Sequence, residues 1–377
     1  MKYLSDYTAG RDNNFNLLRF VAATAVLVSH SYALATGDAQ TEPLRHLLGM
    51  SLGDIAVGLF FVTSGFLVTG SLLSKCNATE FFLSRALRIY PGLWVAILLT
   101  VAVFGLVFSD LKAADFFTHR ATWRYVITNM VMLGYETYLL PGTFGHLPFA
   151  GAVNGSLWSL PFELRMYLLL GFAWVVLAKI NPQPARWFKW FCIVIAASTV
   201  LLDLAFVWIQ VSDPSAYREP RIIGLGAAFF SGAALRVLQD RVPVSLAIFF
   251  LLAAALALSA ATSGFQVVYK LTFAYVVLYL ALVPRGWLLK FNQLGDYSYG
   301  IYIYAFAVQQ SIVYSIPGIT PTQLIAGSFP PTLGLAVASW YLVEKRALRF
   351  RPQRQLAVPT VPAAPAVPAV PVATSRR

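Results

Sequence analysis

Apolar blocks about 20 residues long recur along most of this chain, and they constrain its fold more than any other feature. A helix of about 20 residues crosses the hydrocarbon core of a bilayer, where the backbone must satisfy its own hydrogen bonds. Hydrophobic residues make up 58% of the sequence and charged residues only 12%. Soluble domains carry about 25% charged residues. The blocks therefore predict an all-α, polytopic membrane protein with about ten transmembrane helices.

The expected spans extend almost to residue 350. They are residues 14–36, 52–74, 86–109, 156–179, 189–211, 221–238, 243–262, 265–283, 297–317 and 330–347. An even number of spans puts both termini on one side of the membrane. If that side is the cytoplasm, most Lys and Arg residues between the blocks face inward, as the positive-inside rule requires. We therefore expect a multi-pass protein with both termini cytoplasmic.

The chain divides into two parts by composition. Residues 1–350 form the expected membrane domain, and residues 351–377 form a tail rich in Pro, Ala and Val that is expected to be flexible and extended. The formal net charge is +12, but the basic residues lie between apolar blocks and form no single stripe. This pattern indicates membrane topology and argues against nucleic-acid binding.

The connection over residues 110–155 is the longest in the chain and contains a partly apolar, aromatic run. A connection of this length is usually a functional lid or an interfacial segment. The alternative is a shallow amphipathic helix on the membrane surface.

Arg19 and His30 stand out in the first span because ionisable side chains are rare inside a membrane. Eleven residues, close to three helical turns, separate them, so both are expected on one helix face about 16 Å apart along the axis. Burial disfavours the charged imidazolium, and a neutral His30 could accept a proton near pH 7. This face would suit a long substrate with an anionic head and a reactive far end, such as a coenzyme A thioester. The alternative for His30 is a core histidine satisfied by neighbouring polar groups.

Further charged residues lie within or beside the expected spans. Arg85 and Arg88 are three residues apart at the inner end of the third span, where guanidinium groups can bind phosphate oxygens, although topology alone explains many such pairs. Glu163 lies in the fourth span, and an intramembrane carboxylate indicates function unless it pairs with Arg165 or Lys270.

A third possible function, a metal-dependent membrane hydrolase, would use Asp115 and His119, four residues apart in the long connection, together with His146. A catalytic zinc site needs three protein ligands at a defined spacing, and these residues do not supply one. We therefore expect no metal site.

Six motifs in order, over about residues 10 to 350, resemble acyltransferase family 3. They are Arg-x10-His in the first span, FFVTSGFL in the second, RALRIYPGLW entering the third, SLWSLPFELRMYLL in the fourth, DYSYGIYIYAF in the ninth and SWYLVEKR in the last. Members of this family are integral membrane enzymes that acylate, usually acetylate, hydroxyl groups of surface polysaccharides, lipooligosaccharides and some antibiotics.

The resemblance implies roles for the matching residues. His30 and Glu163 would be catalytic, Arg19, Arg85 and Arg88 would bind acyl-CoA, and Ser64, Trp158, Tyr299 and Glu344 would be supporting residues. It also implies acyl-CoA, usually acetyl-CoA, as a co-substrate without a bound cofactor, a carbohydrate or glycolipid acceptor, and a place in the bacterial inner membrane. The ninth span departs from the family, because Ala305 stands where many members have a second histidine.

The expected reaction is the transfer of a short acyl group from acyl-CoA to a carbohydrate hydroxyl, with His30 as general base. Glu163, if it lies near His30, would orient the imidazole and stabilise its protonated form. Glu344 is expected to pair with the arginines. The alternative function is a carrier or flippase for an anionic or lipid-linked substrate, since buried charges also line transport pathways. The lack of internal repeat symmetry argues against a carrier.

Overall fold

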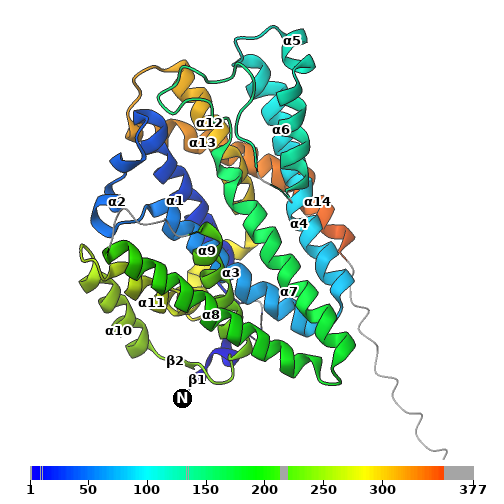
Figure 1. Ribbon diagram of the computed structural model, residues 1–377, viewed down its shortest axis with the longest axis vertical. Coiled ribbons are helices and arrows are strands. Elements are labelled where there is room, and N and C mark those ends of the chain that lie inside the picture. Colours follow the sequence, from blue (N-terminus) through cyan, green and yellow to red (C-terminus); the bar gives the residue numbers. More distant parts are fainter. Residues whose placement is uncertain are drawn as a thin grey trace, which may run out of the picture.

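Figure 1 shows the computed structural model, which describes residues 2–351 except residues 9, 11, 133, 135 and 213–219. The described residues are predominantly helical, which confirms the all-α fold class. Apart from Arg351, the expected proline-rich tail lies outside the described residues.

Each of the ten expected spans corresponds to one long helix. These helices are α1 (Phe15–Thr36), α3 (Leu52–Lys75), α4 (Ala78–Leu99), α7 (Leu160–Ile180), α8 (Pro184–Ser212), α9 (Arg221–Val237), α10 (Leu246–Ser259), α11 (Phe265–Leu282), α12 (Ser298–Ser315) and α13 (Pro321–Ser339).

Shorter elements connect the long helices. The short α-helices are α2 (Pro43–Leu48), α5 (Ala113–Thr118), α6 (Arg120–Val131) and α14 (Lys345–Ala347). Among the described residues, the 3-10 helices are η1 (Leu4–Tyr7), η2 (Ala39–Thr41), η4 (Gly155–Ser159), η5 (Gly286–Gln293) and η7 (Leu348–Phe350). Two π-helices, η3 (Thr100–Gly105) and η6 (Trp340–Glu344), extend α4 and α13. Strands β1 (Lys2–Tyr3) and β2 (Pro243–Val244) pair antiparallel and join the N-terminal segment to the α9–α10 connection.

Six helical segments among the described residues are long and apolar enough to cross a bilayer: Phe15–Thr36, Leu52–Lys75, Ala78–Gly105, Gly155–Ile180, Pro184–Gln210 and Phe265–Leu282. The other four expected spans are helical but shorter or more polar. Helix α9 has 17 residues and α10 has 14. Helix α12 carries Gln309 and Gln310, which are fully buried against neighbouring segments and so lower its apolar character without facing lipid. The fold therefore agrees with a polytopic membrane protein.

Two helices begin well before the expected boundary because polar caps start them earlier. Asn77 caps α4, so this helix begins at residue 78 where the apolar pattern predicted residue 86. Thr320 and Gln323 form a capping box that starts α13 at residue 321 where residue 330 was expected. Arg85 therefore lies seven residues, or about 10 Å, inside α4 rather than at its inner end.

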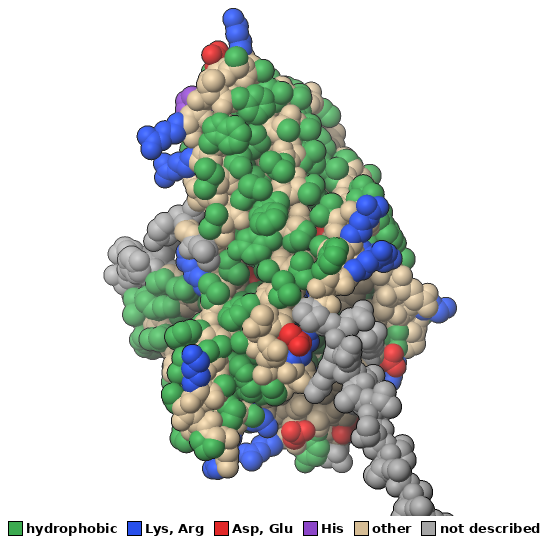
Figure 2. All heavy atoms as spheres, turned by 90° about the vertical axis from the view of Figure 1, so that its right-hand side faces the viewer, with side chains coloured by type: hydrophobic (Ala, Val, Ile, Leu, Met, Phe, Trp, Pro, Cys, Tyr) green, Lys and Arg blue, Asp and Glu red, His purple; other side chains and the backbone are tan. Residues whose placement is uncertain are grey.

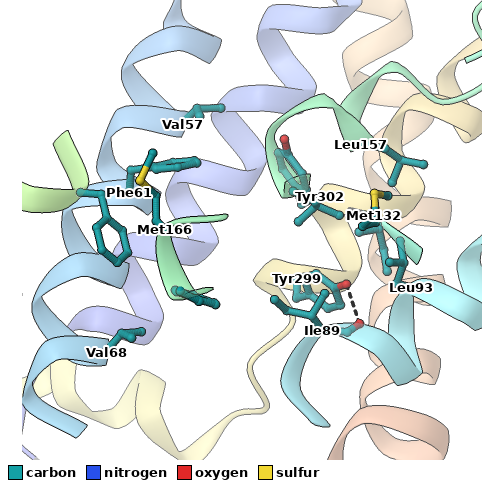
Figure 3. Packing of buried hydrophobic residues seen from close by; sticks show 14 of the residues in the cluster. Val57, Phe61, Val68, Ile89, Leu93, Met132, Leu157, Met166, Tyr299 and Tyr302 are labelled. Carbon is teal, nitrogen blue, oxygen red and sulfur yellow. Dashed lines mark hydrogen bonds between the residues drawn. The ribbon is translucent and has the colours of Figure 1, made fainter. Parts of the chain in front are cut away.

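The close approach of α3 and α9 forms the centre of the bundle. A Cβ added at Gly65 would lie 1.8 Å from the carbonyl oxygen of Phe229, and one at Gly232 would lie 2.1 Å from that of Val62. Only glycine fits at either position, which explains the small residues of the second expected span. Around this contact, buried apolar side chains of several helices, including Phe61, form one core, part of which is drawn in Figure 3.

Much of the outer surface is apolar, as expected for helices in contact with lipid. Figure 2 shows hydrophobic side chains over most of the upper and middle part of one face, with Lys and Arg toward its margins and lower part. Large exposed side chains such as Trp94, Leu98 and Phe172 come from α4 and α7. A soluble protein rarely exposes apolar surface of this extent.

The long connection over residues 110–155 lies at the end of the bundle farthest from the N-terminus, where Figure 1 shows α5 and α6. Helix α6 packs on α4, where the Trp94 indole donates to the carbonyl of Met130 at 3.1 Å. The rest of the connection folds back over α12, because Gln310 Nε2 donates to the carbonyls of Phe149 and Ala152 at 2.9 and 2.8 Å. The connection therefore covers the bundle as well as contributing a surface helix.

Candidate active site

Arg19 and His30 of α1 both lie on the side of this helix that meets α3 and α12. The Arg19 guanidinium is 5.8 Å from the centroid of the Phe60 ring on α3, and its Nη1 is 4.0 Å from Oδ2 of Asp296, just before α12. The His30 ring packs edge-on against Phe306 of α12, with the ring centroids 5.3 Å apart. One face of α1 thus presents a cation and an imidazole at two depths.

Arg88 is the centre of an ion-pair cluster. Its Nη2 lies 2.5 Å from Asp296 Oδ2, and its Nη1 lies 3.5 Å from Glu344 Oε2. Glu344 also accepts a hydrogen bond from Ser339 Oγ at 3.0 Å. Glu344 therefore pairs with the arginines, as the sequence predicted.

Tyr299 supports this cluster. The Arg88 guanidinium lies 5.5 Å from the centroid of the Tyr299 ring, and the Tyr299 hydroxyl donates to the carbonyl of Ile89 at 2.8 Å (Figure 3). The tyrosine thus holds α12 against α4 beside the ion pairs.

Asp296 has a role in this cluster that was not predicted from the sequence. Its carboxylate joins Arg19 and Arg88, which come from different helices. Burial alone would raise the pKa of Asp296, but Arg88 and Arg19 outweigh that effect and hold the pKa below its ordinary value. One feature of the sequence could have indicated this role. Asp296 is an acidic residue directly before the ninth expected span, on the side of the membrane where basic residues were expected.

Arg85 differs from Arg88 in its hydrogen bonding. Its Nε is buried and has no hydrogen-bond partner among the described residues, and the same is true of Arg19 and Arg351. Burial and the nearby charges of Arg85 and Arg88 lower the pKa of Arg351 to about 10. Several arginine N–H donors therefore lack a protein acceptor among the described residues, in a region where positive charges gather. A binding site for an anionic group has both properties.

Glu163 does not contact His30 as the proposed orienting role required. Its carboxylate accepts a hydrogen bond from Ser64 Oγ at 2.9 Å and another from the hydroxyl of Tyr167. It also interacts electrostatically with Arg85. Helix α7 packs against α3 and α4. Glu163 therefore belongs to the part of the site that contains Arg85 and Arg88, here called the arginine end. Ser64 supports Glu163 there through its hydrogen bond.

The alternative partners of Glu163 are engaged elsewhere. Lys270 forms an ion pair with Asp203 of α8. Arg165 donates to the carbonyl of Gly134 at 3.1 Å and lies over the Phe162 ring. The structural pairing considered for Glu163 is therefore wrong.

His30 opens onto a cavity of about 370 Å³ that also contains charged groups. Glu42, Arg45, Asp54 and Arg221 line it together with the imidazole. His30 Nδ1 is buried and has no hydrogen-bond partner among the described residues. The expectation of a core histidine satisfied by its neighbours therefore does not hold for this nitrogen, and the cavity is large enough to hold a small ligand.

The long connection and η4 complete the wall of this cavity. Tyr138, Phe149 and Ala152 of the connection line it. Trp158 of η4 lines it as well, and the Arg221 guanidinium lies 4.7 Å from the centroid of the Trp158 ring. The lid interpretation of the connection thus has a structural basis at the cavity.

The residues considered for a metal site lie apart from this cavity. Nδ1 of His119 accepts a hydrogen bond from the backbone N–H of Ala121, and His146 lies 3.8 Å from Asp110 on the exposed surface. Within the part of the chain that the structure describes, no three His, Cys, Asp or Glu side chains come together as a metal site.

Comparison with known proteins gives consistent matches. A family model described as an acyltransferase domain matches residues 12–341. A protein named O-acetyl transferase from Shigella phage Sf6 is 31% identical over 356 residues, which cover 90% of this chain and 96% of the relative. Nodulation protein 10 of Rhizobium leguminosarum bv. viciae is 29% identical over 381 residues, 92% of this chain and 96% of the relative.

A more distant match covers part of the chain. Acyltransferase MdmB of Streptomyces mycarofaciens is 28% identical over 186 residues, 48% of this chain and 43% of the relative. No solved structure matches this chain.

Proposed function

The chain belongs to acyltransferase family 3, and from this premise we propose that it transfers an acetyl or other short acyl group from acyl-CoA to a hydroxyl of a carbohydrate or glycolipid. The acceptor class includes surface polysaccharide, O-antigen, exopolysaccharide and lipooligosaccharide. The name of the Shigella phage relative, O-acetyl transferase, supports transfer of acetyl to oxygen. We place the protein in the bacterial inner membrane with both termini in the cytoplasm.

One observation carries the proposal: His30, whose buried Nδ1 has no hydrogen-bond partner among the described residues, lines a polar cavity, and the same face of α1 carries Arg19 beside arginines with unused donors. A long donor with an anionic head at the arginines and a reactive group at the cavity fits this arrangement. Eleven residues of α1 correspond to about 16 Å.

The reaction needs one proton acceptor. His30 removes the proton from the acceptor hydroxyl as its oxygen attacks the thioester carbonyl, so that a C–O bond forms. The C–S bond then breaks, and the departing CoA thiolate takes the proton from the imidazolium. General base catalysis of this kind contributes about 10²–10⁴-fold in rate.

The donor phosphates would bind chiefly to Arg85. Arg88 already has two carboxylate partners, Asp296 and Glu344, whereas Arg85 has unused hydrogen-bonding capacity among the described residues. Arg19 also contributes positive charge, although it shares Asp296. No bound cofactor is needed for this chemistry.

The test uses the full-length protein in lipid nanodiscs with radiolabelled acetyl-CoA and candidate glycans. Transfer of label to a glycan, with release of free CoA thiol, supports the proposal. The competing function is a carrier or flippase, which the buried charges also allow. Transport of glycan across sealed vesicles without thioester consumption would establish that alternative and exclude acyl transfer.

A further inference from the structure

A second space, here called the side chamber, adjoins the His30 cavity. Its volume is about 230 Å³, and it lies among α3, α8, α9 and α11. The two spaces share four lining residues, Asp54, Val57, Trp158 and Arg221. Because the same side chains face both spaces, the side chamber adjoins the place where the reaction is proposed to occur.

The side chamber contains charged groups at positions where lipid-facing helices would carry none. Asp203 of α8 is only 1% exposed and forms an ion pair with Lys270 of α11. Ser231 and Tyr269 line the same space.

The Asp203–Lys270 pair calls for a functional explanation. A buried ion pair contributes little net stability compared with apolar residues of the same size, and charged residues between transmembrane helices usually mark a substrate or ion site. Neither residue takes part in the proposed chemistry at His30. Both line the side chamber, so a ligand there would contact them.

The charges of the side chamber define the kind of ligand that fits. Among the described residues that line it, Asp54 and Asp203 supply negative charge, and Arg221 and Lys270 supply positive charge in equal number. A site for phosphate or another anion would carry an excess of basic residues. This balanced set of hydrogen-bond donors and acceptors suits an uncharged molecule with many hydroxyl groups.

The remaining wall is apolar and aromatic. Trp158, Phe273 and Val57 line it. A sugar ring has polar hydroxyls around its edge and apolar C–H groups on its faces, so it requires both kinds of surface. Small-molecule sites commonly combine an apolar wall with a few polar groups that orient the ligand.

We propose that the side chamber is the acceptor subsite and binds an uncharged pyranose ring whose attacking hydroxyl reaches His30 past Trp158. This inference rests on the proposed function. Asp203 accepts hydrogen bonds from the sugar, and Lys270 and Arg221 donate to it. The acyl-CoA arm approaches His30 from the arginine end, so donor and acceptor meet at the imidazole from different sides.

Cysteine protection tests binding without turnover. Ser231→Cys is made with Cys76→Ala, because Cys76 is exposed while Cys192 is buried. The rate of labelling by N-ethylmaleimide is measured with methyl glycosides of glucose, galactose, rhamnose and N-acetylglucosamine. At least one glycoside should slow labelling by about threefold once its concentration is about twice its Kd. The matched control is Ser198→Cys in the outward groove of α7 and α8, whose labelling should not change.

A second variant tests the ion pair. The double substitution Asp203→Asn and Lys270→Met removes both charges together, so neither is left buried without its partner. Introduced with Ser231→Cys, it should abolish protection by the glycoside. In a turnover assay it should raise KM for the acceptor by at least about tenfold, or about 1.4 kcal/mol, and leave KM for acetyl-CoA unchanged. Thr199→Val is the control, because Thr199 lies one turn from Asp203 on α8 and bonds only to backbone carbonyls of its own helix among the contacts the structure describes.

The outcomes separate this inference from the proposed function. Lack of protection by every glycoside, or protection that survives the double substitution, overturns the acceptor subsite even if acyl transfer occurs. Protection by a glycoside in a protein that never consumes acetyl-CoA would show that the side chamber binds a sugar, but would overturn the proposed transfer and with it the role of this sugar as an acceptor.

Discussion

Arg19 and His30 lie on one face of α1, but their surroundings differ. At the arginine end, Asp296 pairs with both Arg19 and Arg88, and Glu344 also pairs with Arg88. At the other end, His30 faces a cavity, and its Nδ1 has no partner among the described residues. At the arginine end, protein carboxylates therefore neutralise most of the positive charge. At the His30 end, a polar atom without a protein partner among the described residues remains available to a ligand.

This difference separates residues that hold the structure from residues that are available for substrate. A buried polar group without a partner lowers the free energy of unfolding. Where such a group is kept beside a cavity, we expect a bound ligand to supply the missing hydrogen bond. Arg88 belongs to the first kind and His30 to the second. Arg85 lies beside Arg88, but its unpartnered Nε resembles His30 in this respect.

The largest expected effect is at His30. His30→Ala and His30→Gln should lower kcat for acetyl transfer by about 10²–10⁴-fold, because His30 is the general base of the proposed reaction. Transfer of label from acetyl-CoA measures the loss, with the amount of protein in the membrane determined in parallel. His46→Gln serves as the control, since His46 is exposed on α2. Normal turnover in a well-inserted His30→Ala variant would show that His30 is not the general base.

Arg88→Ala should chiefly reduce stability. It leaves Asp296 and Glu344 without their main partner, and breaking a buried pair in this way costs about 3–5 kcal/mol. Denaturant unfolding in detergent measures the change. Adding Asp296→Asn should recover part of it, and wild-type stability in the single variant would refute the structural role.

The same variant should change how stability depends on pH. A carboxyl with a lowered pKa stabilises the folded state above its unfolded value, about 3.9 for Asp, and loses this contribution as the pH falls toward its folded pKa. In the wild type, Arg88 and Arg19 keep the pKa of Asp296 low against the effect of burial. Without Arg88 the folded pKa of Asp296 should rise toward or above its unfolded value, so the variant should lose less stability than the wild type as the pH falls through this range. Denaturant unfolding midpoints of both proteins across this pH range measure the difference.

Arg85→Ala should act on the donor rather than on folding. Loss of hydrogen bonds to a charged group costs about 1.5–3 kcal/mol, so KM for acetyl-CoA should rise about 10- to 100-fold while the unfolding midpoint changes little. Arg165→Ala is the matched control, because Arg165 donates to a backbone carbonyl on the surface. An unchanged KM would mean that Arg85 does not bind the donor and serves only to set the membrane topology.

The smallest effect is expected for the ion pair at the mouth of the His30 cavity. Arg45 Nη2 lies 3.4 Å from Asp54 Oδ2, and the two side chains are 30% and 43% exposed. Arg45→Gln should therefore cost only about 0.2–1 kcal/mol of stability, and less at high salt. Unfolding midpoints at two salt concentrations check this. A loss as large as that of Arg88→Ala would contradict the distinction between the two ends.

Much of the helical framework was predictable from the sequence. Runs of about 20 apolar residues form helices in a bilayer by local rules, and all ten expected spans correspond to helices. The eleven-residue spacing placed Arg19 and His30 on one face because helical periodicity is local too. The six ordered motifs indicated the family that the match over residues 12–341 shows.

The tertiary structure decided which helices are neighbours. The orienting role of Glu163 depended on its lying near His30, but the packing of α7 against α3 and α4 directs it to Ser64 and Tyr167. Spacing along one helix says nothing about which other helix it contacts, so Asp296 could not be recognised as the shared partner of Arg19 and Arg88. The side chamber arises from the packing of α3, α8, α9 and α11, and only this packing brings Asp203 and Lys270 together beside Trp158.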